Sequence, residues 1–211
     1  MGIPVLILGE SGSGKSTSLR NFKPNEVGII GVVGKLLPFR SELKVYNLNK
    51  SSKARNVDRY TLLKQLLTAS KTPSMVIDDS QYLMSFDSFD RAKVKGYDKF
   101  TEMAVSFKEL IDFVIDVLPE DKIVYFLHHI ETTDTGKTKI KTIGKMLDSQ
   151  LTVEGMFTIV LLCQTDKSTH KFITQNDGTT TAKAPMEMFQ DSEIDNDLKL
   201  VDKSIREYYK L

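Results

Sequence analysis

The sequence has one cysteine, no tryptophan and no long uninterrupted apolar run among its 211 residues. One cysteine cannot form a disulfide within the chain, which favours a reducing compartment. That residue, Cys163, lies in an apolar run, and we expect it to be a small core residue. The apolar runs fall far short of the roughly 20 residues of a membrane span, and the first residues do not resemble a secretory signal. We therefore expect a cytoplasmic protein with no membrane partner.

The sequence also has little net charge, since 29 Lys and Arg residues face 28 Asp and Glu residues. A formal charge of +1 gives no overall attraction to nucleic acid or anionic lipid, so a site for a polyanion would have to be local. The histidines and the cysteine lack the spacing of a zinc site. The length and the 40% hydrophobic content suit a single domain over residues 1–211, with a core at 1–190 and a C-terminal helix at 191–211.

A glycine-rich stretch near the amino terminus carries the strongest functional signal. An apolar run at residues 3–8 leads into Gly9, Glu10, Ser11, Gly12, Ser13, Gly14, Lys15, Ser16 and Thr17. Glycines let backbone N–H groups surround a phosphate, and a helix expected at residues 15–22 adds its positive end. Lys15 would reach the β- and γ-phosphates, and the Ser16 hydroxyl would bind Mg²⁺. The spacing predicts a phosphate-binding loop for a nucleotide.

Two later apolar runs end in polar residues that would complete such a site. Residues 74–77 lead into Asp78 and Asp79, and we expect Asp78 to hold Mg²⁺ through water. Residues 122–127 form another expected strand, which delivers His128 and His129 to its end. Because adjacent side chains of a strand point to opposite faces, at most one histidine can face the nucleotide. We take His129 for that role, either as a sensor of the γ-phosphate or as a hydrogen-bonded histidine at a strand end.

The remaining pattern alternates strands with helices. Further strands are expected at residues 27–33, 43–48 and 156–163, and helices at 58–69, 97–118 and 191–211. Residues 171–175 and 179–184, joined by Asn176-Asp177-Gly178, predict a hairpin. We expect an α/β fold with a mainly parallel central sheet flanked by helices and a late β-hairpin. The nucleotide would lie at the carboxyl ends of the strands.

Seven stretches carry a wider resemblance, at residues 9–17, 33–40, 76–82, 96–100, 128–131, 141–147 and 179–185. Together they resemble the RecA-like P-loop ATPases of bacteriophages, also called AAA-family ATP-binding proteins, some of which anneal single strands. The resemblance implies a RecA-like fold and ATP hydrolysis coupled to DNA recombination or annealing in the host cytoplasm. It also implies single-stranded DNA as a ligand, a homo-oligomer with ATP or ADP between subunits, and phage or host replication and recombination proteins as partners.

The resemblance assigns two further residues. RecA-like assemblies place a cation from a neighbouring subunit at the nucleotide, and Lys183 matches its position, although it could equally be a solvated hairpin lysine. RecA-like enzymes also commonly orient the attacking water with a glutamate at the end of the strand after the loop, but here that strand ends with residues 30–34, which include no carboxylate. We therefore expect Asp79 to orient the water, with Glu42 and Glu131 as alternatives.

Contact with DNA would depend on three basic groups, at residues 35–59, 91–99 and 137–145, each of which could instead be a solvated face. Phe39, Tyr46 or Tyr97 could stack on unpaired bases. Two other functions remain open. The missing glutamate favours a nucleotide-gated module, such as a helicase loader, with little hydrolysis. A small-molecule kinase would also use the loop, although the chain lacks an arginine-rich lid segment.

Overall fold

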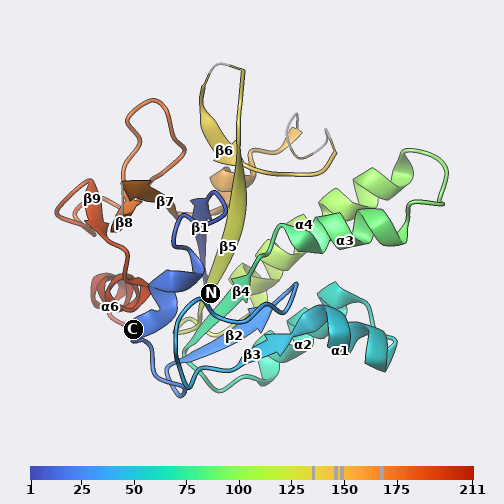
Figure 1. Cartoon of the computed structure of the whole chain (residues 1–211), viewed down its shortest axis with the longest axis horizontal. Helices are drawn as coiled ribbons and strands as arrows, with labels where there is room; N and C mark the ends of the chain where they lie inside the picture. The colour runs from blue at the N-terminus through green and yellow to red at the C-terminus, as the bar shows by residue number, and fades with distance from the viewer. Residues whose placement is uncertain (135, 145–146, 148–149, 167–168) are drawn as a thin grey trace.

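The computed structural model is built around one sheet, whose central strand carries the glycine-rich loop. It describes residues 1–134, 136–144, 147, 150–166 and 169–211. Strand β1 (Ile3–Gly9) lies between β5 (Ile123–Thr132) and β7 (Ile159–Asp166), and the three run parallel. Across the described sheet the order is β3-β2-β4-β5-β1-β7-β8-β9, with β6 (Thr138–Ile140) paired antiparallel to β5 (Figure 1).

The part of the sheet that runs from β5 through β4 and β2 to β3 is entirely parallel. Strand β4 (Ser74–Asp78) pairs with β5, β2 (Val27–Gly31) with β4, and β3 (Val45–Asn47) with β2. Parallel strands end at the same edge of a sheet, so the ends of β1, β2, β4 and β5 lie together. The predicted α/β fold with a mainly parallel sheet flanked by helices is confirmed.

The antiparallel edge differs from the predicted hairpin. Strand β8 (Thr169–Ile173) pairs with β7 on one side and with β9 (Glu193–Asp195) on the other. Both edges of β8 are therefore occupied, and residues 179–184 do not pair with it. Asn176 and Asp177 still form a turn, because their side chains accept hydrogen bonds from the backbone N–H groups two residues ahead. The turn was predicted correctly, but the pairing of 171–175 with 179–184 was wrong.

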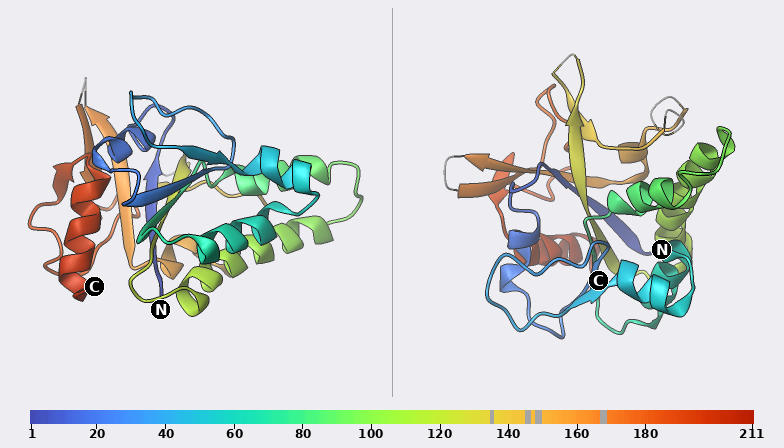
Figure 2. Two further views of the ribbon diagram at one scale, coloured as in Figure 1. Left: turned by 90° about the horizontal axis from the view of Figure 1, so that it is seen from below. Right: turned by 45° about the vertical axis from the view of Figure 1, so that its right-hand side comes forward.

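Two hydrophobic layers cover the sheet, because successive strand side chains point to opposite faces. On one face, Leu6 and Leu8 of β1 pack with α2 (Arg59–Ala69), α3 (Tyr82–Asp90) and α4 (Asp98–Val117). On the other, Val5 and Ile7 pack with η1 (Ser16–Asn21) and α6 (Leu198–Tyr209). Figure 2 shows the two groups on opposite sides of the strands. In the described part of the chain, no helix is both long and apolar enough to cross a bilayer.

Most long helices lie where the periodicity predicts them, and the exceptions are short or lie in polar segments. Helix α2 begins directly after Asp58, whose side chain accepts from the backbone N–H of Thr61 at 2.9 Å. Helices α1 (Leu48–Arg55) and α3 were missed, and β9 precedes α6 within the expected tail helix. The helix expected at 15–22 is only a 3₁₀ helix, η1, which ends before Pro24. Its positive end is therefore weaker than that of the α-helix we expected.

Helix α6 is joined to the sheet by a buried polar network around Asp202. The carboxylate accepts hydrogen bonds from Tyr125 Oη at 2.9 Å, from Arg206 Nε at 2.8 Å and from Ser74 Oγ. Arg206 also donates to Ser74 Oγ at 2.9 Å. Complete burial, together with the charge of Asp202, raises the pKa of Tyr125 well above its ordinary value. The network connects the beginnings of β4 and β5 to α6.

Candidate nucleotide-binding site

The glycine-rich loop leaves β1 at the carboxyl edge of the sheet. Gly12 and Gly14 have φ angles of +81° and +100°, a region that strains other residues. Between them, the backbone N–H of Ser13 donates to the carbonyl of Glu10 at 3.2 Å. A Cβ added to Gly9 would lie 2.4 Å from Ser13 Oγ, so the end of the strand also requires glycine. These glycines give the loop the tight curl that a phosphate cradle needs.

Lys15 folds back over the loop. Its Nζ donates to the carbonyl oxygens of Gly9 and Glu10, at 2.7 Å each. Burial lowers the pKa of Lys15, although the nearby Asp78 and Asp79 oppose this effect. Its direct partners are neutral carbonyls, so the ammonium can form a charge-assisted bond with an incoming phosphate.

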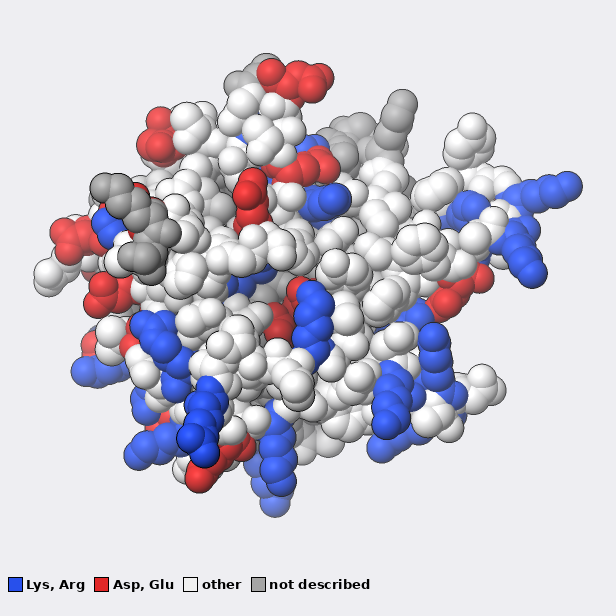
Figure 3. Space-filling model, in the orientation of Figure 1, with Lys and Arg blue, Asp and Glu red and all other residues white. Residues whose placement is uncertain are grey.

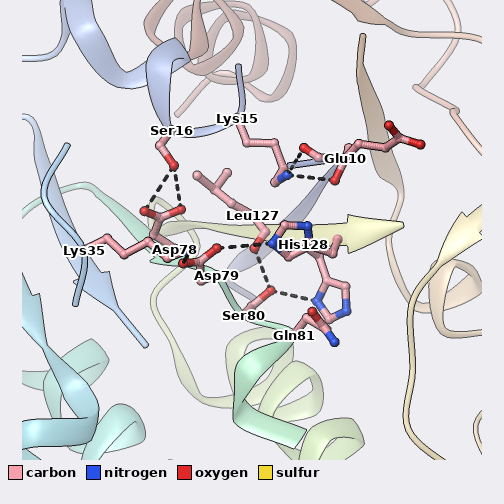
Figure 4. Close-up of polar contacts among 12 residues, drawn as sticks. Glu10, Lys15, Ser16, Lys35, Asp78, Asp79, Ser80, Gln81, Leu127 and His128 are labelled. Atoms are coloured by element: carbon pink, nitrogen blue, oxygen red, sulfur yellow. Dashed lines mark hydrogen bonds and ion pairs between the residues drawn. The ribbon is translucent and has the colours of Figure 1, made fainter. Parts of the chain in front are cut away.

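Ser16 and Asp78 contact each other where β4 ends beside the loop. Ser16 Oγ donates to both carboxylate oxygens of Asp78, at 3.0 and 3.2 Å (Figure 4). Burial raises the pKa of Asp78, and the negative charge of Asp79 raises it further. A hydroxyl and a carboxylate are the hard oxygen donors that Mg²⁺ takes, together with water and substrate phosphates. The pair therefore fits Mg²⁺, and within the described residues no group of three His, Cys, Asp or Glu forms an all-protein metal cage.

Asp79 contacts two basic side chains beside this pair. Its backbone has a φ of +61°, which is uncommon for a residue other than glycine. One carboxylate oxygen lies 2.9 Å from Lys35 Nζ, and the other lies 3.4 Å from His129 Nε2, without hydrogen-bond geometry. Burial favours a raised pKa for Asp79, but His129 and Lys35 outweigh burial and hold it below its ordinary value. The predicted Asp79 and His129 thus lie together, and His129 also packs edge-on against the Tyr82 ring.

Two hollows flank the loop. One, of about 220 Å³, is lined by Gly14 to Thr17 together with Lys35, Asp78, Asp79 and His129. The other, of about 480 Å³, lies between the first half of the loop and Gln164 and Thr165 of β7. Each predicted loop residue from 10 to 17 lines at least one of the two.

Cys163 supports the loop from β7. Its Sγ donates to the carbonyl of Ser13 at 2.8 Å and accepts from Asn196 Nδ2 at 3.1 Å. Burial raises the pKa of the thiol to about 11, so it stays protonated. The expectation that Cys163 is a buried core residue is confirmed.

His128 points to the face opposite His129, as strand alternation predicts. Both histidines lie within β5, because that strand continues to Thr132 and does not end at residue 127. His128 Nε2 donates to the carbonyl of Lys141, and Nδ1 lies 2.8 Å from Ser80 Oγ (Figure 4). Burial lowers the pKa of His128 to about 3, and the nearby His129 and Lys15 add to this. His128 is therefore a hydrogen-bonded core histidine.

We expect His128 to make the fold less stable as the pH falls. In the unfolded chain a histidine binds a proton near pH 6.5, whereas folded His128 does so only at about pH 3. Between these values the unfolded state binds the extra proton, so the free energy of unfolding decreases as pH falls, by up to about 1.4 kcal/mol per unit. The free energy of unfolding can be measured with urea at several pH values from about pH 7 to about pH 5. A plot of this free energy against pH should have a flatter slope for His128→Gln than for the wild type or His170→Gln. Parallel slopes for all three would contradict the assignment.

Three residues with a predicted or alternative catalytic role lie away from the group formed by Lys15, Ser16, Asp78, Asp79 and His129. Lys183 pairs through its backbone with Val160, at 2.8 Å in both directions, and Val160 faces Leu6 in the middle of β1. Lys183 is therefore not at its own chain's loop, and its role toward a neighbouring subunit stays a prediction. Glu131 pairs with Lys139 at 2.9 Å and Glu42 is exposed, so Asp79 has the best position among the three candidate bases.

Two residues at the loop were not predicted. Lys35 was assigned to a DNA-binding group, but it contacts Asp79 at the site. Its position after a parallel strand, whose carboxyl end lies at this edge of the sheet, was the signal in the sequence that could have placed it here. His170 of β8 lies against the loop, since a Cβ on Gly14 would lie 2.6 Å from its ring. No local pattern marks His170, because the contact depends on where β8 joins the sheet.

Several residues of the expected DNA-binding groups are already paired. Arg59 contacts Asp90 at 2.6 Å, and Arg91 pairs with Asp87 at 2.7 Å and also with Glu102. Other basic side chains gather along the lower and right-hand sides of the face in Figure 3, where a few acidic ones lie among them, while most of the upper left is acidic or uncharged. Lys145 lies outside the described residues.

No protein-family model matches the sequence, and no curated protein matches it either.

Proposed function

We propose that this chain is a RecA-like P-loop ATPase that binds ATP with Mg²⁺ and hydrolyses it. The observation that supports this most is the convergence of three elements at one sheet edge. The loop brings Lys15 and Ser16, β4 brings Asp78 within 3.0 Å of Ser16, and β5 brings His129. A glycine-rich cradle, an ammonium and a hydroxyl–carboxylate pair are the groups that phosphoryl transfer uses.

Each group has a distinct role in this proposal. The backbone N–H groups of residues 10–17 bind the phosphates, and Lys15 exchanges its carbonyl partners for phosphate oxygens. Asp79 orients the attacking water, and His129, beside it, contacts the γ-phosphate side of the hollow. Ser16 and Asp78 would hold Mg²⁺, which, when bound, neutralises charge on the β- and γ-phosphates.

The proposed biological role is supported by the resemblance to the RecA-like P-loop ATPases of bacteriophages. We infer an action in DNA recombination or single-strand annealing, with single-stranded DNA bound by basic side chains outside the salt bridges above. The proposed assembly is a homo-oligomer with nucleotides between subunits, and the partners are phage or host replication and recombination proteins.

The first experiment is to measure phosphate release by the purified protein with ATP and Mg²⁺, with and without single-stranded DNA. We expect ADP production that rises with single-stranded DNA and does not change when nucleosides are added. Phosphorylation of a nucleoside would instead identify a small-molecule kinase. An absence of both nucleotide binding and hydrolysis would contradict the proposal.

One observation favours the alternative of a nucleotide-gated module with little hydrolysis. The turn after β2 brings a lysine to the site, where the resemblance implies a glutamate that orients water. Tight binding of ATP with negligible turnover, both with and without DNA, would support this alternative.

A further inference from the structure

Lys35 follows the strand end at which the resemblance implies a carboxylate. Strand β2 ends at Gly31, and the chain turns through Gly34, with a φ of +80°, to bring Lys35 to the carboxyl edge of the sheet. Its Nζ lies 2.9 Å from Asp79 Oδ2 and 5.5 Å from the centre of the Tyr82 ring. Figure 4 shows the Lys35 side chain extending toward the acidic residues at the end of β4. A cation therefore stands beside the proposed water-orienting group.

The segment that carries Lys35 is anchored on both sides. Before it, the backbone N–H of Val32 donates to the carbonyl of Asp78 at 3.0 Å. After it, Leu37 and Phe39 pack against the hydrophobic layer on the α6 face of the sheet. The backbone of Lys35 is thus tied to the site, whereas its side chain is 58% exposed and can change partners.

Lys35 and Lys15 line the same hollow. Both line the 220 Å³ hollow together with Ser16. Two ammonium groups that repel each other across a hollow are stabilised when an anion binds between them. Lys183, by contrast, would need a second subunit to reach any nucleotide.

We propose that Lys35 supplies, from within the same chain, the positive charge that stabilises the γ-phosphoryl group during hydrolysis. This inference rests on the proposed ATPase function and assigns the cation of that reaction. When the triphosphate fills the hollow, Lys35 leaves Asp79 for a γ-phosphate oxygen, and Asp79 becomes free to hold the attacking water. The exchange couples nucleotide binding to the release of the water-orienting group.

The reaction then proceeds as an ordinary hydrolysis. The water oxygen bonds to the γ-phosphorus while the bond to the β,γ-bridging oxygen breaks, and ADP keeps that electron pair. One proton of the water passes through Asp79 to solvent, and the other stays on the released phosphate. Lys35 forms no covalent bond, and its charge offsets the negative charge on the equatorial oxygens.

The test compares Lys35→Ala, Lys35→Arg and Lys183→Ala by kcat, by affinity for a fluorescent ATP analogue, and by trapping of ADP with aluminium fluoride. Loss of one group that stabilises a transition state costs about 10²-fold in kcat, so we expect that loss for Lys35→Ala. Its affinity for the ATP analogue should change far less, and its trapping of ADP with aluminium fluoride should disappear. Lys35→Arg should keep most of the activity, and Lys23→Ala, which removes an exposed lysine, should match the wild type.

The outcomes separate this inference from the proposed function. If wild type hydrolyses ATP and Lys35→Ala keeps its kcat and its aluminium fluoride complex, the inference is overturned and the ATPase remains. If Lys183→Ala loses more activity than Lys35→Ala, and the activity depends on protein concentration, the cation comes from a neighbouring subunit. If wild type neither binds nor hydrolyses ATP, the proposed function itself fails.

Discussion

Replacing Lys15 with alanine should abolish measurable ATP hydrolysis. The ammonium lies over the glycine-rich loop, bonded to two carbonyl oxygens at 2.7 Å. Loss of one charged hydrogen bond costs about 1.5–3 kcal/mol, which corresponds to about 10- to 100-fold weaker ATP binding. Loss of transition-state stabilisation should reduce kcat by about 10²- to 10³-fold. Phosphate release and equilibrium titration with a fluorescent ATP analogue measure the two effects.

The matched control is Lys23→Ala, because Lys23 is an exposed lysine in the turn that follows η1. Its hydrolysis rate and affinity should equal those of the wild type. Thermal unfolding of both variants without nucleotide separates a loss of the site from a loss of the fold. If a folded Lys15→Ala protein bound and hydrolysed ATP at the wild-type rate, the glycine-rich loop would not be the phosphate site.

Replacing Asp202 with alanine should destabilise the fold by about 3 kcal/mol or more, the cost of removing one partner of a buried ion pair. Asp202 is 8% exposed and accepts from Tyr125, Ser74 and Arg206. Alanine would leave the guanidinium without its carboxylate, and the buried tyrosine hydroxyl would lose its acceptor. Urea unfolding measures the change as a lower midpoint with little change in slope.

Lys203 of the same helix provides the control. Its pair with Glu207, at 3.5 Å, is exposed, so Lys203→Ala should change the free energy of unfolding by less than about 1 kcal/mol. Equal effects of the two alanine variants would show that the buried network does not hold α6 to the sheet.

The parts of the structure that could be predicted from the sequence depend on local patterns. Glycine at positions 9, 12 and 14 and Lys-Ser at 15–16 form the loop through local geometry, so short-range reasoning found it. Asp78 was correctly predicted to lie at the end of a strand, because an apolar run that leads into an acidic residue is typical of such an end. Helix α4 was found because its buried residues recur at helical spacing over 20 residues.

The parts that could not be predicted depend on which strand edges are occupied. The hairpin at 171–184 failed because β9, from later in the chain, takes the edge of β8 that 179–184 would need. Lys35 was assigned to DNA because its position after a parallel strand, the one signal available, does not show that Asp79 lies 2.9 Å from it. Helix α1 has too few apolar residues for periodicity to reveal it, and α3, with only 9 residues, is too short to show a clear period.

The contacts beneath the glycine-rich loop also constrain how the protein can fold during its synthesis. Ser13 is synthesised 150 residues before Cys163, which holds it. His170, which lies on Gly14, and Asn196, which bonds the Cys163 thiol, follow later still. Contacts between residues so far apart in the chain form late in folding. A nascent chain on the ribosome would therefore carry the glycine-rich loop without the supports that shape it until residues 163–196 had emerged, and the proposed ability to bind nucleotide would arrive only then.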